Sequence, residues 1–116
     1  MRRVKVVSDS GDMKVEHWIE AWGELNEDSF RRRLENEGYS VIRYDYPAGT
    51  YFSNHTHPFD KKDAVLFGQF LIRAEGREFI LVPGDALHVP AGTVHSAEVL
   101  GRETVVSLDA SKLIKA

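Results

Sequence analysis

The sequence predicts an all-β sandwich or barrel, preceded by a short extension that contains one helix. From Tyr39 onward, apolar and polar residues alternate with period two, which is typical of strands with one buried face. Turn segments such as Pro47-Ala48-Gly49 recur every few residues, a rhythm that indicates short antiparallel strands. A small jelly roll accommodates such strands and leaves few sheet edges exposed. We therefore expect an extension over residues 1–38 and a barrel over residues 39–116.

Composition narrows the classes of function. The chain has 116 residues, 15 basic and 18 acidic side chains and a net charge of −3, which does not suggest a nucleic-acid partner. It has no cysteine, which excludes disulfides, thiolate metal ligands and thiol catalysis. No apolar run reaches the length of a membrane span, and the MRRVKVVSDSGD terminus lacks the apolar core of a signal peptide. These features predict a cytoplasmic protein without a membrane partner.

The extension carries one expected strand and two tryptophans. Residues 14–19 alternate, with His17 predicted to be an ordinary partly buried or surface side chain. Trp18 and Trp22 are predicted to pack in a subunit interface or to close one end of the barrel. Apolar surface of this kind favours a partner copy, so we expect a homodimer.

The helix is predicted over residues 28–37. Asp28 is expected to cap its first turn by accepting a backbone N–H. Phe30 and Leu34 lie four residues apart and share one face. Gly38 is the expected stop signal.

Beyond the helix, the alternation predicts a strand over 40–46 and a strand over 50–57. The second would place Tyr51, His55 and His57 on one face. Residues 60–63 are expected to form a polar loop. Hairpin turns are predicted at Glu75-Gly76 and Gly101-Arg102, and residues 109–116 are predicted to be a tail. The other expected strands are 64–67, 69–74, 78–82, 86–89, 94–100 and 103–108.

Three histidines form a candidate metal site. His55 and His57 lie two residues apart, so on a strand both imidazoles aim at one point. Two such ligands need at least one more, and His95 can supply it. Imidazole is a good ligand for transition metals. The glycine and proline residues that frame these histidines strengthen the metal-binding interpretation over that of structural histidines.

The frame resembles a known family. Residues 49–68, GTYFSNHTHPFDKKDAVLFG, are similar to the first motif of the cupin superfamily, G-x5-H-x-H-x3,4-E-x6-G. Residues 84–95, GDALHVPAGTVH, are similar to its second motif, G-x5-P-x-G-x2-H-x3-N. The resemblance implies a double-stranded β-helix barrel with a metal inside one end. It also implies oligomers, and it is uninformative about substrate.

Two positions depart from the motifs. Val99 stands in the asparagine position, and Lys61 stands where the family has a glutamate, its usual fourth protein ligand. A protonated lysine has no acceptor and cannot ligate a metal. Lys61 is therefore expected to point into solvent, while the alternative is that Asp60 or Asp63 takes the ligand role through a shift of the loop. The sequence leaves open whether Lys61 instead faces the cavity, where it would add a positive charge to that of the metal.

Such a site would hold a divalent ion, namely zinc, iron, manganese or nickel. Tyr44, Tyr46 and Tyr51 are candidates for proton donors near the cavity, with plain packing as the alternative. His88 can face either side, because a slip of one residue inverts a strand. No catalytic base is assigned.

Two classes of function remain open. The first is a metal-dependent cupin enzyme of the dioxygenase, isomerase or lyase class. The second is a non-catalytic cupin that binds a small molecule as a sensor or store. Because neutral imidazoles leave the metal its full charge, we expect a small chelating anion as ligand: a 2-oxo acid, hydroxy acid, enolate or sugar acid.

Overall fold

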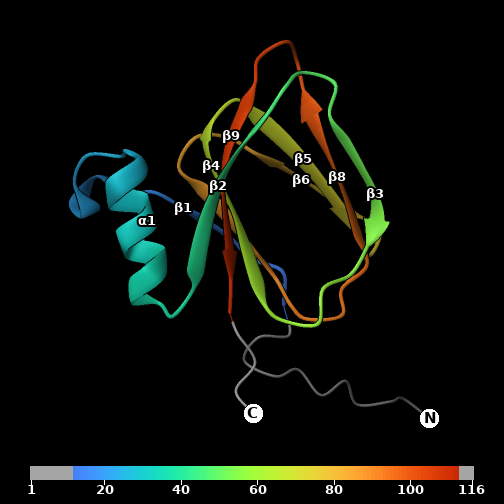
Figure 1. Cartoon of the computed structure of the whole chain (residues 1–116), viewed down its shortest axis with the longest axis horizontal. Coiled ribbons are helices and arrows are strands. Elements are labelled where there is room, and N and C mark those ends of the chain that lie inside the picture. The colour runs from blue at the N-terminus through green and yellow to red at the C-terminus, as the bar shows by residue number, and fades with distance from the viewer. Residues whose placement is uncertain (1–11, 113–116) are drawn as a thin grey trace.

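Two antiparallel sheets that face each other make up the protein (Figure 1). The computed structural model describes residues 12–112. The strand order is β1-β7-β4-β9-β2 in the first sheet and β3-β8-β5-β6 in the second. The predicted all-β barrel with one helix is confirmed. Within the described residues the elements are β1 (Val15–His17), a 3-10 turn η1 (Glu20–Trp22), α1 (Glu27–Asn36), β2 (Ser40–Tyr46), β3 (Tyr51–His55), β4 (Lys61–Phe67), β5 (Gln69–Ala74), β6 (Arg77–Leu81), β7 (Asp85–Val89), β8 (His95–Leu100) and β9 (Val105–Ser111).

The helix α1 covers the outer face of the five-stranded sheet (Figure 1). Phe30 and Leu34 are buried on its inner side, as their spacing predicts. They pack on apolar outward-facing side chains of the sheet, which are Ala64, Ala86, Leu108 and Ala110. The prediction that Asp28 caps the first turn is wrong, because the cap is Asn26, two residues earlier. The side chain of Asn26 accepts the N–H of Ser29, and the Ser29 hydroxyl accepts the N–H of Asn26, so this pair closes the first turn.

The two tryptophans attach the helix to the barrel. The ring of Trp18 lies edge-on to Phe30, with 5.3 Å between centroids, and edge-on to Trp22 at 5.4 Å. The guanidinium of Arg33 stacks on the Trp22 ring, 3.3 Å from its centroid. Trp18 belongs to the cluster under the helix, so it does not close a barrel end. The packing stabilises the extension against the sheet.

The inner faces of both sheets meet in an apolar core. Val65, Leu87 and Val105 from the first sheet and Ile72 and Leu81 from the second are completely buried there. The core fills one part of the barrel, and the other part holds the polar side chains described below. No helix among the described residues is long and apolar enough to cross a membrane.

One of the two predicted hairpins differs from the structure. The hairpin at Glu75-Gly76 is confirmed, since β5 pairs with β6. The hairpin at Gly101-Arg102 is wrong: β8 pairs with β3 and β5, whereas β9 pairs with β2 and β4 in the other sheet. Local turn residues mark where the chain reverses but do not determine which sheet receives the next strand.

Two further boundaries are corrected. Residues 61–63, predicted as loop, begin β4, and residues 109–111, predicted as tail, end β9. Both segments are charged or small, so they lack the apolar alternation that marks a strand. Their pairing with each other extends the sheet, with Lys61 opposite Ser111 and Asp63 opposite Asp109. Residues 113–116 of the predicted tail lie outside the described residues.

Candidate metal centre

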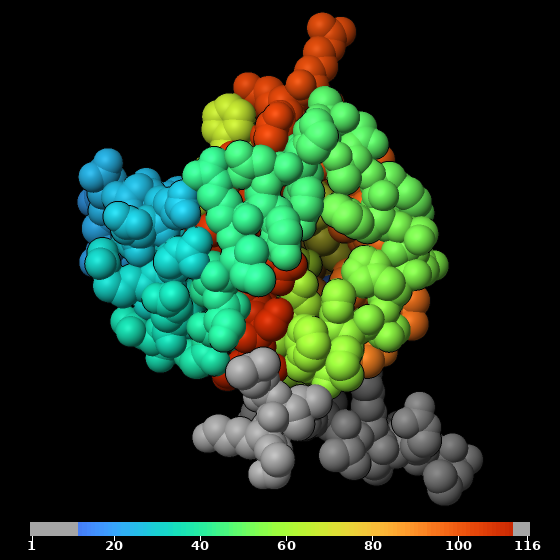
Figure 2. All heavy atoms as spheres, in the orientation of Figure 1, coloured from blue at the N-terminus to red at the C-terminus, as the bar shows by residue number. Residues whose placement is uncertain are grey.

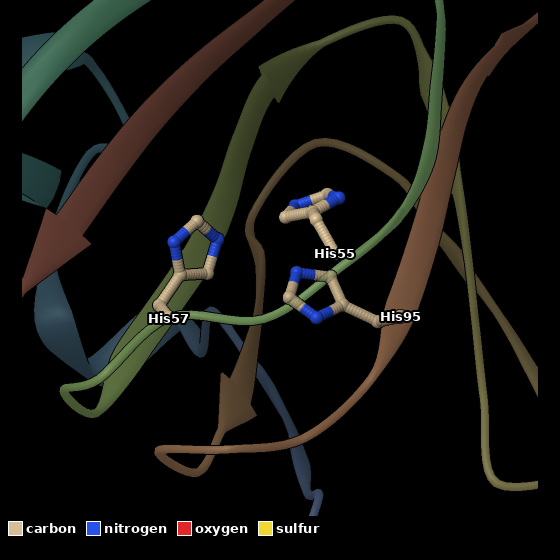
Figure 3. Close-up of side chains that lie close together, drawn as sticks. All are labelled: His55, His57 and His95. Atoms are coloured by element: carbon tan, nitrogen blue, oxygen red, sulfur yellow. The ribbon is translucent and has the colours of Figure 1, made fainter.

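Three histidines converge inside one end of the barrel (Figure 3). His55 ends β3, His57 follows in the next loop and His95 begins β8. The nitrogen atoms that they offer all lie within 4.8 Å of one another. The ring centroids of His55 and His95 are 4.3 Å apart, those of His55 and His57 4.9 Å, and those of His57 and His95 5.3 Å. The structure thus brings together the three histidines that the sequence singled out.

A β-bulge turns His55 toward its partners. Phe52 lies opposite Ala97 and His55 opposite His95. A step of three residues along β3 thus corresponds to a step of two along β8, so β3 contains one extra residue. Phe52 and His55 therefore share the inner face, although they lie three residues apart and a regular strand would place them on opposite faces. The predicted strand over 50–57 with Tyr51, His55 and His57 on one face is wrong. β3 ends at His55, so His57 lies in the loop, and Tyr51 is 59% exposed and lies on the outside. The alternation of residue types did not reveal this extra residue.

Backbone carbonyls orient two of the rings. Nδ1 of His55 lies 2.7 Å from the carbonyl of Ser53, and Nδ1 of His95 lies 2.9 Å from that of Thr93. A carbonyl only accepts, so in each ring Nδ1 donates and Nε2 keeps its lone pair. This arrangement is typical of metal-binding histidines, whose second nitrogen is held by a protein acceptor.

The surroundings favour neutral imidazoles. Burial, reinforced by the charge of Lys61, lowers the pKa of His57 to about 4. Burial also lowers the pKa of His95. At neutral pH both rings are therefore uncharged, which a metal ligand must be. The donor set of three imidazoles fits a divalent transition metal, while three ligands leave further coordination positions for substrate or water.

A buried ion-pair network lies in the same cavity. Lys61 is only 6% exposed, and its Nζ lies 2.6 Å from Oδ1 of Asp109 and 3.8 Å from Oδ1 of Asp63. The expectation that Lys61 points into solvent is wrong. Burial is also the main cause of the raised pKa of Asp63. Asp109 was missed, because it lies in the segment predicted as tail; its place in the sheet opposite Asp63 identifies it.

The remaining candidates lie elsewhere. Oδ1 of Asp60 accepts the backbone N–H of Ala91 at 2.8 Å, which fixes the loop before β4, and Asp60 does not line the histidine cavity. His88 lies opposite Lys62 on the outer side of the sheet, and its Nδ1 is 2.9 Å from the carbonyl of Asp12. His17 pairs with Asp85 at the edge of the sheet.

The cavity has a volume of about 320 Å³. Figure 2 shows a hollow between β2 and the segment that follows β3, where inner strands are visible at the base. Tyr44 and Tyr46 line the cavity, as predicted, whereas Tyr51 lines a separate groove on the outer surface. Besides the histidines and the ion-paired residues, the walls are formed by Tyr44, Tyr46, Phe52, Phe70, Ala97 and Ser107.

Comparison with protein families matches residues 42–111 to the family described as Cupin domain. This match spans more than half of the chain, and the histidine site and both sheets lie largely within it. The protein therefore belongs to the cupin family.

Individual relatives agree with this assignment. Quercetin 2,3-dioxygenase of Bacillus subtilis (strain 168) is 39% identical over 59 residues, which are 50% of this chain and only 18% of that enzyme. The structure of KdgF from a Halomonas species is 26% identical, with a TM-score of 0.57 and coverage of 67% of this chain and 72% of that one. A cupin superfamily protein of Desulfitobacterium hafniense is 16% identical, with a TM-score of 0.59 and coverage of 94% and 84%. The last likeness concerns the fold alone.

Proposed function

We propose that the protein is a metal-dependent enzyme that acts on a small anionic metabolite, in the dioxygenase, isomerase or lyase class. The observation that carries the proposal is the convergence of His55, His57 and His95, with ligand atoms within 4.8 Å of one another, at a cavity that a small molecule can enter. The name of one relative, quercetin 2,3-dioxygenase, is consistent with the class.

Each residue of the site has a distinct role in this proposal. The three imidazoles hold one divalent ion, which supplies Lewis acidity to a chelated oxygen or lowers the pKa of bound water. Lys61, held by Asp109, provides hydrogen-bond donors for an acidic group of the ligand. The barrel walls exclude bulk water from one side of the ligand.

The charges of the cavity favour an anion. A divalent ion and Lys61 together carry three positive charges, and the two carboxylates of Asp63 and Asp109 offset at most two of them. The remainder is positive, and electrostatic attraction in such a partly enclosed cavity is stronger than in bulk water. A ligand that is both anionic and able to chelate satisfies the metal and the cavity together.

The metal site is tested by elemental analysis of untagged protein purified without chelators. We expect one divalent ion per chain in the parent protein and its loss in His57→Ala. The matched control is His88→Ala, because His88 lies on the outer side of the sheet. Equal metal content in the parent and His57→Ala would exclude the proposal.

The same analysis separates the ligand sets. We expect Asp60→Ala and Asp63→Ala to retain the metal, because Asp60 holds the N–H of Ala91 and Asp63 is close to Lys61. Loss of metal in either variant would add that carboxylate to the three histidines.

We also propose that the protein is a homodimer. Large apolar side chains remain on its surface, among them Phe67, Ile80 and Val82, and such surface favours a partner. Light scattering tests this at micromolar concentration, where a mass of 13.1 kDa would identify a monomer and exclude the dimer.

A further inference from the structure

The walls of the cavity differ in chemistry. The polar part of the lining consists of the three histidines, the ion-paired residues around Lys61 and Ser107. The apolar part is almost entirely aromatic. It is built by Tyr44 and Tyr46 of β2, Phe52 of β3 and Phe70 of β5, with Ala97 as the small exception. A ligand that fills the cavity must therefore satisfy a polar chelating end and an apolar face at once.

The aromatic rings form one contiguous wall. Tyr46 lies nearly parallel to Tyr44, with 5.8 Å between centroids, and is stacked with Phe70 at 5.6 Å. Phe52 meets Tyr46 edge-on at 5.0 Å. Phe70 is buried, whereas Tyr44 at the other end of the row is 41% exposed. The wall thus begins in the core and ends with an accessible ring at the mouth of the cavity.

The apolar strip continues beyond Tyr44. Ile42 lies two residues before it, so both side chains lie on the same face of β2, and Ile42 is 56% exposed. β2 is an edge strand that pairs only with β9 within the described residues. Exposed apolar surface that is continuous with a cavity lining marks a surface for a ligand.

Resting on the function proposed above, we infer that the ligand is an aromatic hydroxy acid or a close relative, with a ring against Tyr44, Tyr46 and Phe52 and an acid group toward the histidines and Lys61. A cavity of about 320 Å³ has room for a single ring with a short acid group. Aromatic rings prefer aromatic neighbours in offset or edge-to-face contacts, and this preference exceeds what the buried area alone contributes.

Three hydroxy acids that differ only in the group beside the acid test the inference: glycolate, mandelate and cyclohexylglycolate. Calorimetric titration uses the full chain loaded with zinc, which is redox-inert. We expect mandelate to bind at least about tenfold more tightly than glycolate, because it buries a ring. We expect mandelate to bind roughly 2- to 10-fold more tightly than cyclohexylglycolate, which carries a six-membered ring of similar size that is not aromatic.

Equal affinity for mandelate and glycolate would overturn the inference. Equal affinity for mandelate and cyclohexylglycolate would also overturn it, because the wall would then act as apolar surface without preference for an aromatic ring.

Variants of Tyr44 locate the effect. Tyr44→Leu should remove most of the preference for mandelate over cyclohexylglycolate, and Tyr44→Phe should keep it. Tyr51→Leu is the matched control, since Tyr51 is a more exposed tyrosine on the outside of β3. An equal loss of preference in Tyr44→Leu and Tyr51→Leu would overturn the assignment of the ring to this wall. The three titrations of the parent protein remain decisive if a variant does not fold.

Two further titrations separate this inference from the proposed function. Mandelate should bind at least about tenfold more weakly to the metal-free protein, and mandelamide should bind more weakly than mandelate to the zinc-loaded protein. Failure of either result counts against the metal and anion proposal. If both results hold but mandelate binds no more tightly than cyclohexylglycolate, the inference of an aromatic ligand is overturned and the metal and anion proposal stands.

Discussion

The two faces of the five-stranded sheet use the same strands for opposite purposes. On the outer face, Ala64 and Ala110 are completely buried beneath α1. On the inner face, their neighbours Asp63 and Asp109 approach Lys61 in the histidine cavity. Side chains alternate along a strand, so adjacent residues of β4 and β9 lie on opposite faces, one in the apolar cluster and the next in the polar cavity.

The comparison separates stability from function within one sheet. The outer face gains free energy from the apolar burial of Phe30, Leu34 and Leu108 beneath the helix. The inner face buries Lys61, Asp63 and His95 beside an apolar core, and taking charges out of water costs free energy unless they are paired. We expect the helix side to contribute stability alone, whereas the inner face combines the apolar core between the sheets with the cavity for the ligand.

The largest effect is expected from Leu34→Ala. Leu34 is only 1% exposed beneath the helix, so its truncation leaves a cavity and should lower the free energy of unfolding by about 2–5 kcal/mol. Denaturant titration measures this loss. Metal content at saturation should not change, because Leu34 belongs to the cluster on the outer face. Ile42→Ala is the control for an exposed apolar side chain, and loss of metal in Leu34→Ala would break the comparison.

A smaller effect is expected on the inner face from Asp109→Asn. This change removes the charge beside Nζ of Lys61, which is almost fully buried. Breaking a buried pair is destabilising, but the Asp109 side chain keeps 22% exposure to the open cavity, so we expect a loss of about 1–3 kcal/mol.

The double-mutant cycle with Lys61→Met isolates the pair. The double variant should recover part of the stability, because no unpaired ammonium remains. If the double variant lost as much unfolding free energy as the two single variants together, Lys61 and Asp109 would not be coupled.

The sequence predicted the outer face better than the inner one. Phe30 and Leu34 follow the helical period and β2 follows the period of two, so apolar patterning alone located them. Inside the barrel, the bulge in β3 changes the face of Tyr51 without any signal in residue type. The charged ends of β4 and β9 read as loop and tail, because strand pairing between distant segments determines their structure.

The histidines were an exception. Their spacing, together with the glycines and proline of the motifs, identified all three. Asp109 could not be found in this way, since only its pairing opposite Asp63 brings it to the cavity. The spacing within each motif is a local property of the chain, whereas an ion-pair network depends on the sheet.

The two faces should also differ in their response to pH. Burial lowers the pKa of His57 from its usual value of 6.5 to about 4. Between these values the unfolded chain binds a proton that the folded chain does not, so this contribution to stability falls as the pH falls from 6.5 to about 4 and is complete above 6.5. On the outer face, the hydrogen bond from Arg43 lowers the pKa of Glu27 from 4.5, so that contribution is lost only at more acidic pH.

Asp63 acts against His57 in this range. Its pKa is raised above 3.8 by burial, so the folded chain retains a proton that the unfolded chain has released, and this contribution weakens as the pH rises. The slope of the parent protein therefore combines opposing groups. A comparison of the parent with a variant that lacks His57 isolates the contribution of this histidine.

The smallest expected effect is the change of this slope in His57→Gln. Unfolding free energies are measured with a chelator present from about pH 7 to about pH 4, because a bound metal would compete with protons for the ring. His57→Gln should lose stability less steeply than the parent as the pH falls, since the variant lacks the His57 ring, whose pKa is lowered on folding. His95, whose pKa burial also lowers, is present in both proteins. The effect is small because His57 is partly exposed and solvent screens its charge. Leu34→Ala is the control and should shift the whole curve without changing its slope. Identical slopes in the parent and His57→Gln would mean that the cavity does not hold His57 neutral. The difference between the two faces would then depend only on the buried ion pairs of Lys61 with Asp63 and Asp109.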